Sequence, residues 1–182
     1  APSAASNSVT PATVPNAPTI GVATAGNAQV SVSFTPPANN GGSAITGYTA
    51  TCGAQSQSGP SSPIVVTGLT NGTPVTCTVI ATNGVGNSAP SAASNSVTPA
   101  TVPNAPTIGT ATAGNAQVSV AFTPPGNNGG SAITGYTATC GAQSQSGPSS
   151  PIVVTGLTNG TPVTCTVIAT NGVGNSAPSA AS

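Results

Sequence analysis

The sequence has 182 residues and contains no Lys, Arg, Asp, Glu or His, so its formal net charge is zero. Without these side chains it lacks a general acid or base, the cations that bind nucleic-acid phosphates, and the carboxylate and imidazole ligands of metal sites. Serine and threonine have no neighbouring base to activate them as nucleophiles. The composition therefore predicts no enzymatic activity, no cofactor, no metal site and no nucleic-acid partner. No apolar run is long enough for membrane insertion.

An 88-residue repeat organises the chain. The segment that begins at Ala1 returns at Ala89, and its first residues return again at Ala177. A period of this length fits one small domain better than one turn of a solenoid. The two aligned copies differ at three pairs of positions: Val22 and Thr110, Ser33 and Ala121, Ala38 and Gly126.

Short alternating strands separated by turns are predicted within each copy. Apolar and polar residues alternate over residues 29–35 and again over residues 75–82, which gives each strand one face for a core. No stretch has a sustained helical period. Turn-forming pairs interrupt the pattern at Pro36-Pro37, Asn40-Gly41, Asn71-Gly72 and Asn83-Gly84. The pattern therefore predicts an all-β sandwich.

The succession of motifs resembles the fibronectin type III domain, in the form common in secreted bacterial proteins. The motifs are VPNAPTIG, QVSVSFTPP, ITGYTATC, PIVVTGLTNGT, PVTCTVIATNGVGNSAPS and SNSVTP, and the resemblance covers the whole chain. It implies tandem fibronectin type III (immunoglobulin-like) β-sandwiches in an elongated array. Phe34 and Val75 depart from the family, which usually has Trp and Tyr at these two positions, so a smaller core is expected. Its expected members are Val30, Val32, Phe34, Tyr48, Leu69, Val75 and Val79.

The resemblance also sets the expected domain boundaries. Residues 14–101 form one domain, and residues 102–182 form a second domain that lacks its final strand. Residues 1–13 are then the last strand of a preceding repeat plus a linker. Two explanations stay open: the chain is a window of a longer array, or residues 1–11 complete the open sandwich of a neighbouring subunit by strand addition. Both point to a polymer.

In this fold the cysteines fall on inward positions of adjacent antiparallel strands. Disulfides are expected between Cys52 and Cys77 and between Cys140 and Cys165, with buried free thiols or bridges between chains as the alternatives. Each bridge would stabilise its domain by about 3.5 kcal/mol in the chain-entropy model, which offsets a thin core. Disulfides form in oxidising compartments, so an extracellular or cell-surface location follows.

Three other patterns carry weaker signals. Residues 84–89 match a dinucleotide fingerprint, but Pro90 excludes the helix that a pyrophosphate would need, and we interpret them as a turn. Asn71 and Asn159 lie in sequons for N-glycosylation, although turn chemistry alone also explains them. Thr49 and Thr51 are expected beside Thr76 and Thr78, which gives a threonine-rich outer face. Ice binding by this face is disfavoured because sheets of this fold twist.

A chain without charge lacks the repulsion that normally keeps proteins apart, and its strand edges carry only prolines such as Pro15 and Pro18 as guards. The sequence therefore favours a structural subunit of an extracellular filament, fibre or sheath, whose near-identical repeats self-associate end to end and laterally. The partner would be the protein itself, with surface polysaccharide as a further candidate. The alternative is an adhesin stalk or a spacer array of a secreted carbohydrate-active enzyme.

Overall fold

The computed structural model describes residues 7–182, which form two compact units with a boundary between Pro99 and Ala100. Residues 1–6, which belong to the expected last strand of a preceding repeat, lie outside the described residues. All regular elements of the described part are β-strands. No helix that could span a membrane is found among residues 7–182.

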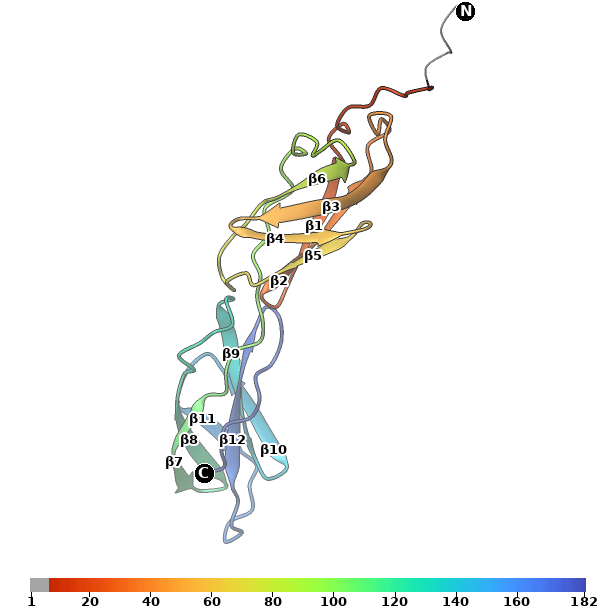
Figure 1. Cartoon of the computed structure of the whole chain (residues 1–182). Coiled ribbons are helices and arrows are strands. Elements are labelled where there is room, and N and C mark those ends of the chain that lie inside the picture. The colour runs from red at the N-terminus through yellow and green to blue at the C-terminus, as the bar shows by residue number, and fades with distance from the viewer. Residues whose placement is uncertain (1–6) are drawn as a thin grey trace, which may run out of the picture. The chain divides into compact units, whose positions relative to one another are not determined.

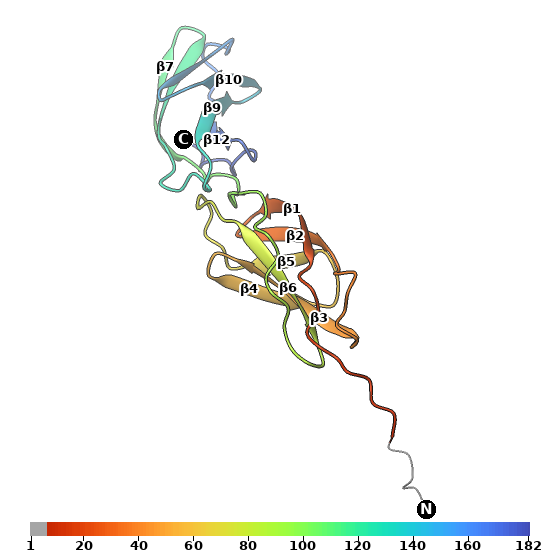
Figure 2. The same cartoon turned by 90° about the horizontal axis from the view of Figure 1, so that it is seen from above.

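The first unit is a sandwich of two antiparallel three-stranded sheets, visible from two directions in Figures 1 and 2. Short strands separated by turns give this arrangement because each strand has one apolar face, and two such faces bury each other. One sheet has the order β1 (Thr19–Gly26), β2 (Gln29–Thr35) and β5 (Ile64–Thr67). The other has the order β4 (Gln55–Gly59), β3 (Ile45–Cys52) and β6 (Cys77–Asn83).

The second unit repeats this topology. Its first sheet has the order β11 (Ile152–Thr155), β8 (Gln117–Thr123) and β7 (Thr107–Gly114). Its second sheet has the order β10 (Gln143–Gly147), β9 (Ile133–Cys140) and β12 (Cys165–Asn171). The chain is thus all-β, with two sandwiches in tandem.

The core of the first unit lies between its two sheets. All of the residues expected there are buried except Val75, which is half-buried and packs against the buried cluster. The rings of Phe34 and Tyr48 lie 4.8 Å apart, centre to centre, and are tilted by 50°. This one aromatic pair, surrounded mostly by valine and alanine, makes the core small.

A disulfide joins the two longest partners of the second sheet. Cys52 at the end of β3 lies directly opposite Cys77 at the start of β6, with their Cα atoms 4.2 Å apart, and both are fully buried. The second unit has the same bond between Cys140 and Cys165. No cysteine is free in the part of the chain that the structure describes.

Two strand starts differ from the sequence predictions. β6 begins at Cys77 instead of Val75, because Val75 pairs with Val97 in an isolated bridge. β1 begins at Thr19, so Pro15 and Pro18 precede the edge strand instead of lying on it. Proline has no N–H to donate, and this is why the strand starts beyond these residues.

A buried asparagine fixes the loops at one end of the sandwich. The side chain of Asn83 is 4% exposed, and its Nδ2 donates to the backbone carbonyls of Thr13 (2.7 Å) and Asn40 (2.9 Å). Its Oδ1 accepts from the N–H groups of Val85 and Gly86. The sequence predicted Asn83 only as a turn former, whereas the structure shows that its amide satisfies polar groups of three separate segments.

Removing one disulfide should destabilise only its own unit. We expect the double substitution Cys52→Ala and Cys77→Ala to lower the free energy of unfolding of the first unit by about 3 kcal/mol, because the 25-residue loop is no longer closed in the unfolded state. Differential scanning calorimetry would resolve this effect. The matched control is Cys140→Ala with Cys165→Ala, which should move only the other transition; equal shifts in both units would contradict the assignment.

Candidate functional site

The described chain offers neutral hydrogen-bonding groups for any functional site. Among residues 7–182 no three potential metal ligands of the types His, Cys, Asp or Glu lie together. In the same residues every buried side-chain nitrogen and oxygen has a hydrogen-bond partner. The groups that remain for recognition are therefore hydroxyls and amides on the sheet faces and along the strand edges.

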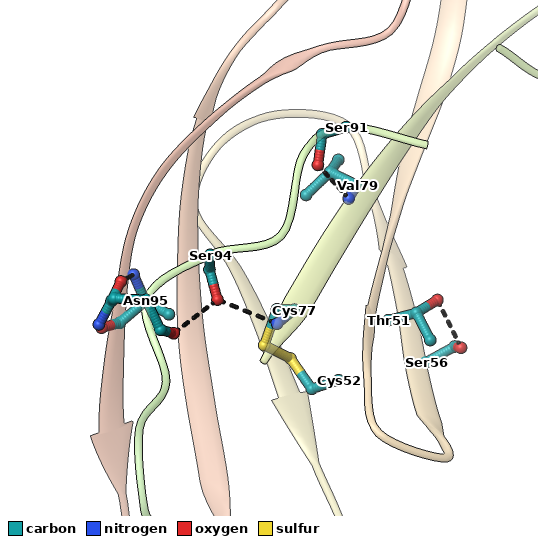
Figure 3. The surroundings of a disulfide bond; sticks show 9 residues. Thr51, Cys52, Ser56, Cys77, Val79, Ser91, Ser94 and Asn95 are labelled. Carbon is teal, nitrogen blue, oxygen red and sulfur yellow. Dashed lines mark hydrogen bonds between the residues drawn. A yellow bond between two sulfur atoms is a disulfide. The ribbon is translucent and has the colours of Figure 1, made fainter. Parts of the chain in front are cut away.

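A row of three serines covers the edge of β6; we call Ser88, Ser91 and Ser94 the serine ladder. Their N–H groups donate to the carbonyls of alternate β6 residues, at 2.8 to 2.9 Å. Their Oγ atoms accept from the N–H groups of the same residues, at 2.9 to 3.0 Å. The β6 partners, in the same order, are Ala81, Val79 and Cys77, and Figure 3 shows the two rungs at Ser91 and Ser94.

The ladder uses three residues of chain for every two residues of β6. A regular strand would supply a backbone carbonyl at each rung, whereas here the serine hydroxyl takes that place. Each hydroxyl also donates to the carbonyl of the residue that follows it, at 2.7 to 2.8 Å. The segment from Ser88 to Ser94 is therefore not a regular strand, and the edge of β6 is closed by hydroxyl groups.

The serine ladder was not predicted from the sequence, because strands are recognised by apolar and polar residues that alternate with a period of two. The available signal was serine at every third position, which recurs in the second copy at Ser176, Ser179 and Ser182. These three residues make the same bonds to β12 as their counterparts make to β6. The serine ladder is thus a repeated structural device.

Hydroxyl groups also cover the outer face of the second sheet. Thr49 and Thr51 of β3 bond to the hydroxyls of Ser58 and Ser56 of β4, at 2.8 and 2.9 Å. The residues predicted beside them on β6 differ in part. Thr51 lies opposite Thr78, but Thr49 lies opposite Ile80, and Thr76 precedes the strand. The isoleucine therefore interrupts the expected threonine row, and the two serines of β4 extend it in the other direction.

A shallow hollow lies at one end of this face. It has a volume of about 480 Å³ in the first unit and 430 Å³ in the second, and equivalent residues line both. Gly47 and Gly59 are among the residues that line it, and hydroxyls of Thr49 and Ser58 border it. The neighbouring Tyr48 is only 7% exposed, so it presents no free ring face on which a sugar could stack.

The remaining sequence motifs lie in turns. Asn71 and Asn159 follow β5 and β11, and the Nδ2 of Asn159 donates to Oδ1 of Asn115 at 2.8 Å. The segment that matched a dinucleotide fingerprint, residues 84–89, forms the turn after β6 and includes the first serine of the ladder, Ser88. The Oδ1 atom of Asn83 accepts from the N–H groups of Val85 and Gly86 in this turn, and no helix follows it.

The family model for the fibronectin type III domain matches residues 16–97 and 103–182. The chain belongs to the fibronectin type III family. Its two sandwiches are thus two fibronectin type III domains in tandem, of a kind that is typically non-catalytic. No curated protein matches the chain.

Solved structures of multidomain proteins are similar to the chain. The crystal structure of chicken CNTN1 FN1-FN3 domains is 19% identical with a TM-score of 0.47, and the match covers 93% of this chain and 66% of that one. The twitchin kinase region from C. elegans is 24% identical with a TM-score of 0.43, over 47% and 17% of the two chains. Titin kinase and its flanking domains is 19% identical with a TM-score of 0.43, over 61% and 27%. The chain thus spans less than two thirds of the length of each of these structures.

The serine ladder gives a prediction for stability. Ser91→Ala should lower the free energy of unfolding of the first domain by about 1 to 3 kcal/mol, because the buried N–H of Val79 loses its acceptor. Chemical denaturation would measure this change. Ser96→Ala, at an exposed position of the same segment, is the matched control and should change stability by less than about 0.5 kcal/mol. Equal effects of the two substitutions would contradict a structural role for the ladder.

Proposed function

We propose that the protein is a structural subunit of an extracellular filament, fibre or sheath, built from near-identical chargeless domains that associate end to end and laterally. The observation that carries the proposal is the complete absence of charged side chains from two tandem fibronectin type III domains. Tandem domains of this family suggest a structural or spacer role. A neutral surface favours self-association, because no electrostatic repulsion opposes contact between two copies of the chain.

The exposed strand edges support lateral association. β4 is an edge strand of its sheet and reads Gln-Ser-Gln-Ser-Gly, with its first four residues exposed. Natural edge strands usually carry charges or prolines that prevent pairing with another chain. β4 has neither, and the equivalent strand β10 has the same sequence. Both domains therefore present the same unguarded neutral edge to a second copy.

The disulfides support a location outside the reducing cytosol. One buried disulfide per domain and the fibronectin type III fold fit an extracellular or cell-surface protein. Within this proposal the source is a bacterium that secretes the protein, as the order of the sequence motifs suggests. Surface polysaccharide is a second proposed partner, which would contact the hydroxyl face of β3 and β4.

An adhesin stalk or a spacer array of a secreted carbohydrate-active enzyme is the second candidate. It is favoured by the scatter of exposed apolar side chains: Val22, Val65 and Val85 are 65%, 41% and 53% exposed, and they come from three different segments of the first domain. A spacer needs no contiguous apolar patch for association, and single exposed valines are ordinary on the surface of a monomeric protein. The two candidates differ in whether the chain forms ordered polymers.

Electron microscopy of the concentrated protein tests the proposed function. We expect ordered fibres or bundles, and we expect lysines on the unguarded edges to disperse them through charge repulsion. The variant carries Gln55→Lys and Gln57→Lys with the equivalent changes at Gln143 and Gln145. The control replaces the same four residues with Thr and should still form fibres. Single dispersed molecules of the unsubstituted chain at every concentration would favour the spacer.

Stability of the fold should hardly depend on pH or salt. Apart from its two termini, the chain has no group that changes charge between about pH 2 and pH 9, so folded and unfolded states should bind nearly equal numbers of protons over this range. Circular dichroism at a series of pH values would show an unchanged spectrum and a melting temperature that stays nearly constant. A cooperative transition in acid would refute this expectation.

A further inference from the structure

The backbone of Cys77 shows in which direction β3 and β4 point their hydrogen-bonding groups. Cys77 donates its N–H to the Oγ of Ser94 and accepts from the N–H of Ser94, both at 2.9 Å, so these groups face away from β3. The opposed residues Cys52 and Cys77 therefore exchange no backbone hydrogen bonds, and their Cα distance of 4.2 Å is typical of such a pair. The backbone groups of Cys52 consequently point to the other side of β3, where β4 lies.

The same alternation sets which residues of β4 face its open side. Gln55 lies opposite Cys52 across a two-residue turn, and these two form a hydrogen-bonded pair. Backbone groups point alternately to the two sides of a strand, so Gln57 also faces β3, whereas Ser56 and Ser58 face away. In the described residues the backbone groups of these two serines make no sheet pairing or loop hydrogen bond on that side. The edge therefore offers two N–H and two C=O groups to another strand.

A second copy of β4 fits this open side in one register. Two identical strands pair antiparallel about a two-fold axis, and hydrogen bonds form only where outward groups meet, so serines must lie opposite serines. With the axis at Gln57, Ser56 of each copy lies opposite Ser58 of the other, and all outward groups are used. An axis at Ser56 would place Ser58 opposite Ala54, which lies in the turn. An axis at Ser58 would place Ser56 opposite Pro60, which has no N–H to donate.

The side chains also match in this register. Ser56 and Ser58 lie on the outer face of the sheet, where their hydroxyls bond to those of Thr51 and Thr49. Figure 3 shows the pair of Thr51 and Ser56. Gln57 meets its own copy on the axis, and an amide can both donate to and accept from another amide. The hydroxyl groups of the two molecules would thus form one continuous surface.

The absence of charge favours a two-fold contact in particular. A residue near a two-fold axis faces its own copy or a close neighbour of it, so a charged side chain there would meet a like charge. The strand Gln55–Gly59 has no charged residue, and its serine and glutamine side chains can all donate as well as accept. Each hydrogen-bonding group of this edge therefore finds its complement in an identical strand, which identifies a second copy of the chain as the occupant.

We propose that β4 pairs with β4 of a second copy of the chain, antiparallel about a two-fold axis at Gln57, so that two three-stranded sheets become one sheet of six strands. β10 has the same sequence and the same pairing to its neighbour β9, so Gln145 marks an equivalent axis in the second domain. Two such edges allow one molecule to bind two others. The inference deepens the proposed filament by naming its lateral contact, and it rests on that function in this respect.

Disulfide cross-linking tests the register. The variant carries Gln57→Cys and Gln145→Cys. We expect covalent oligomers under mild oxidation, because residues on the axis form a non-hydrogen-bonded pair with Cα atoms about 4.5 Å apart, within reach of a disulfide. The native cysteines are buried in their own disulfides and should not compete. Mass spectrometry of the unreduced protein would detect the products.

The matched control carries Gln55→Cys and Gln143→Cys. In the proposed register each of these thiols lies about 13 Å along the strand from its own copy, which is too far for a bond. Equal yields of covalent oligomers from the two variants would overturn the register. The absence of covalent products from both variants would overturn the pairing.

Proline at Ser58 tests the backbone pairing itself. Ser58→Pro with Ser146→Pro removes an outward N–H from each edge and spares the bonds to β3 and β9, and proline is tolerated at such edge positions. Sedimentation velocity should show that the dissociation constant for self-association rises at least about tenfold, because two hydrogen bonds are lost at each contact. The control, with threonine at the same two positions, keeps the N–H and the hydroxyl and should stay within about twofold of the unsubstituted chain. Equally strong association of both folded variants would contradict the proposal, as would an unsubstituted chain that stays monomeric at every concentration.

These outcomes separate the paired edge from the proposed function. Covalent oligomers that depend on the axis position, from a chain that never forms ordered fibres in electron microscopy, would support the pairing and refute the filament. Ordered fibres that form equally well with proline or threonine at Ser58 and Ser146 would refute the pairing and leave the filament proposal standing.

Discussion

Every buried polar group in this protein must be satisfied by a neutral partner, because the sequence offers no ionised side chain. In the described residues every buried side-chain nitrogen and oxygen has a hydrogen-bond partner. Asn83 joins three segments through one amide, and the serine ladder supplies hydroxyl acceptors where a strand would supply carbonyls. Neutral hydrogen bonds each contribute only about 1 kcal/mol net, so the fold depends on having all of them and not on any strong pair.

The same constraint explains the disulfides. Each domain has one Phe and one Tyr as its only aromatic side chains, and most of the buried residues around them are Val and Ala. Burial of small side chains yields little free energy, since the hydrophobic contribution scales with the apolar area removed from water. A covalent bond between the ends of two neighbouring strands raises the free energy of the unfolded state and compensates for the thin core. The stability of each domain therefore comes from burial, neutral hydrogen bonds and a covalent bond, none of which needs an ionised side chain.

The all-β sandwich and most core positions could be predicted from the sequence, because alternation in residues 29–35 and the inward cysteines depend on local periodicity alone. The strand prediction was incomplete where side-chain hydroxyls, instead of backbone carbonyls, accept hydrogen bonds from the backbone of a strand. The serine ladder has a period of three, which differs from the alternation of a regular strand, so the bonds from this segment to β6 were not predicted. Val75 was placed in the core and in β6, but its pairing with Val97 is a tertiary contact that sequence alternation does not encode. The pairing of the Asn95 amide with the backbone of Ala23 could not be predicted for the same reason, since the two residues lie 72 positions apart in the sequence.

The end-to-end and lateral contacts of the proposed filament would use the same neutral hydrogen bonds that hold each domain together. The central claim is therefore that hydroxyl groups close a sheet edge as effectively as a strand does. Amide hydrogen exchange measures this most directly, because exchange requires the hydrogen bond to open. The N–H groups of Cys77, Val79 and Ala81, which bond to the serine ladder, should exchange as slowly as those in the middle of β3. Exchange of these three amides at the rate of an exposed loop, while β3 stays protected, would contradict the account.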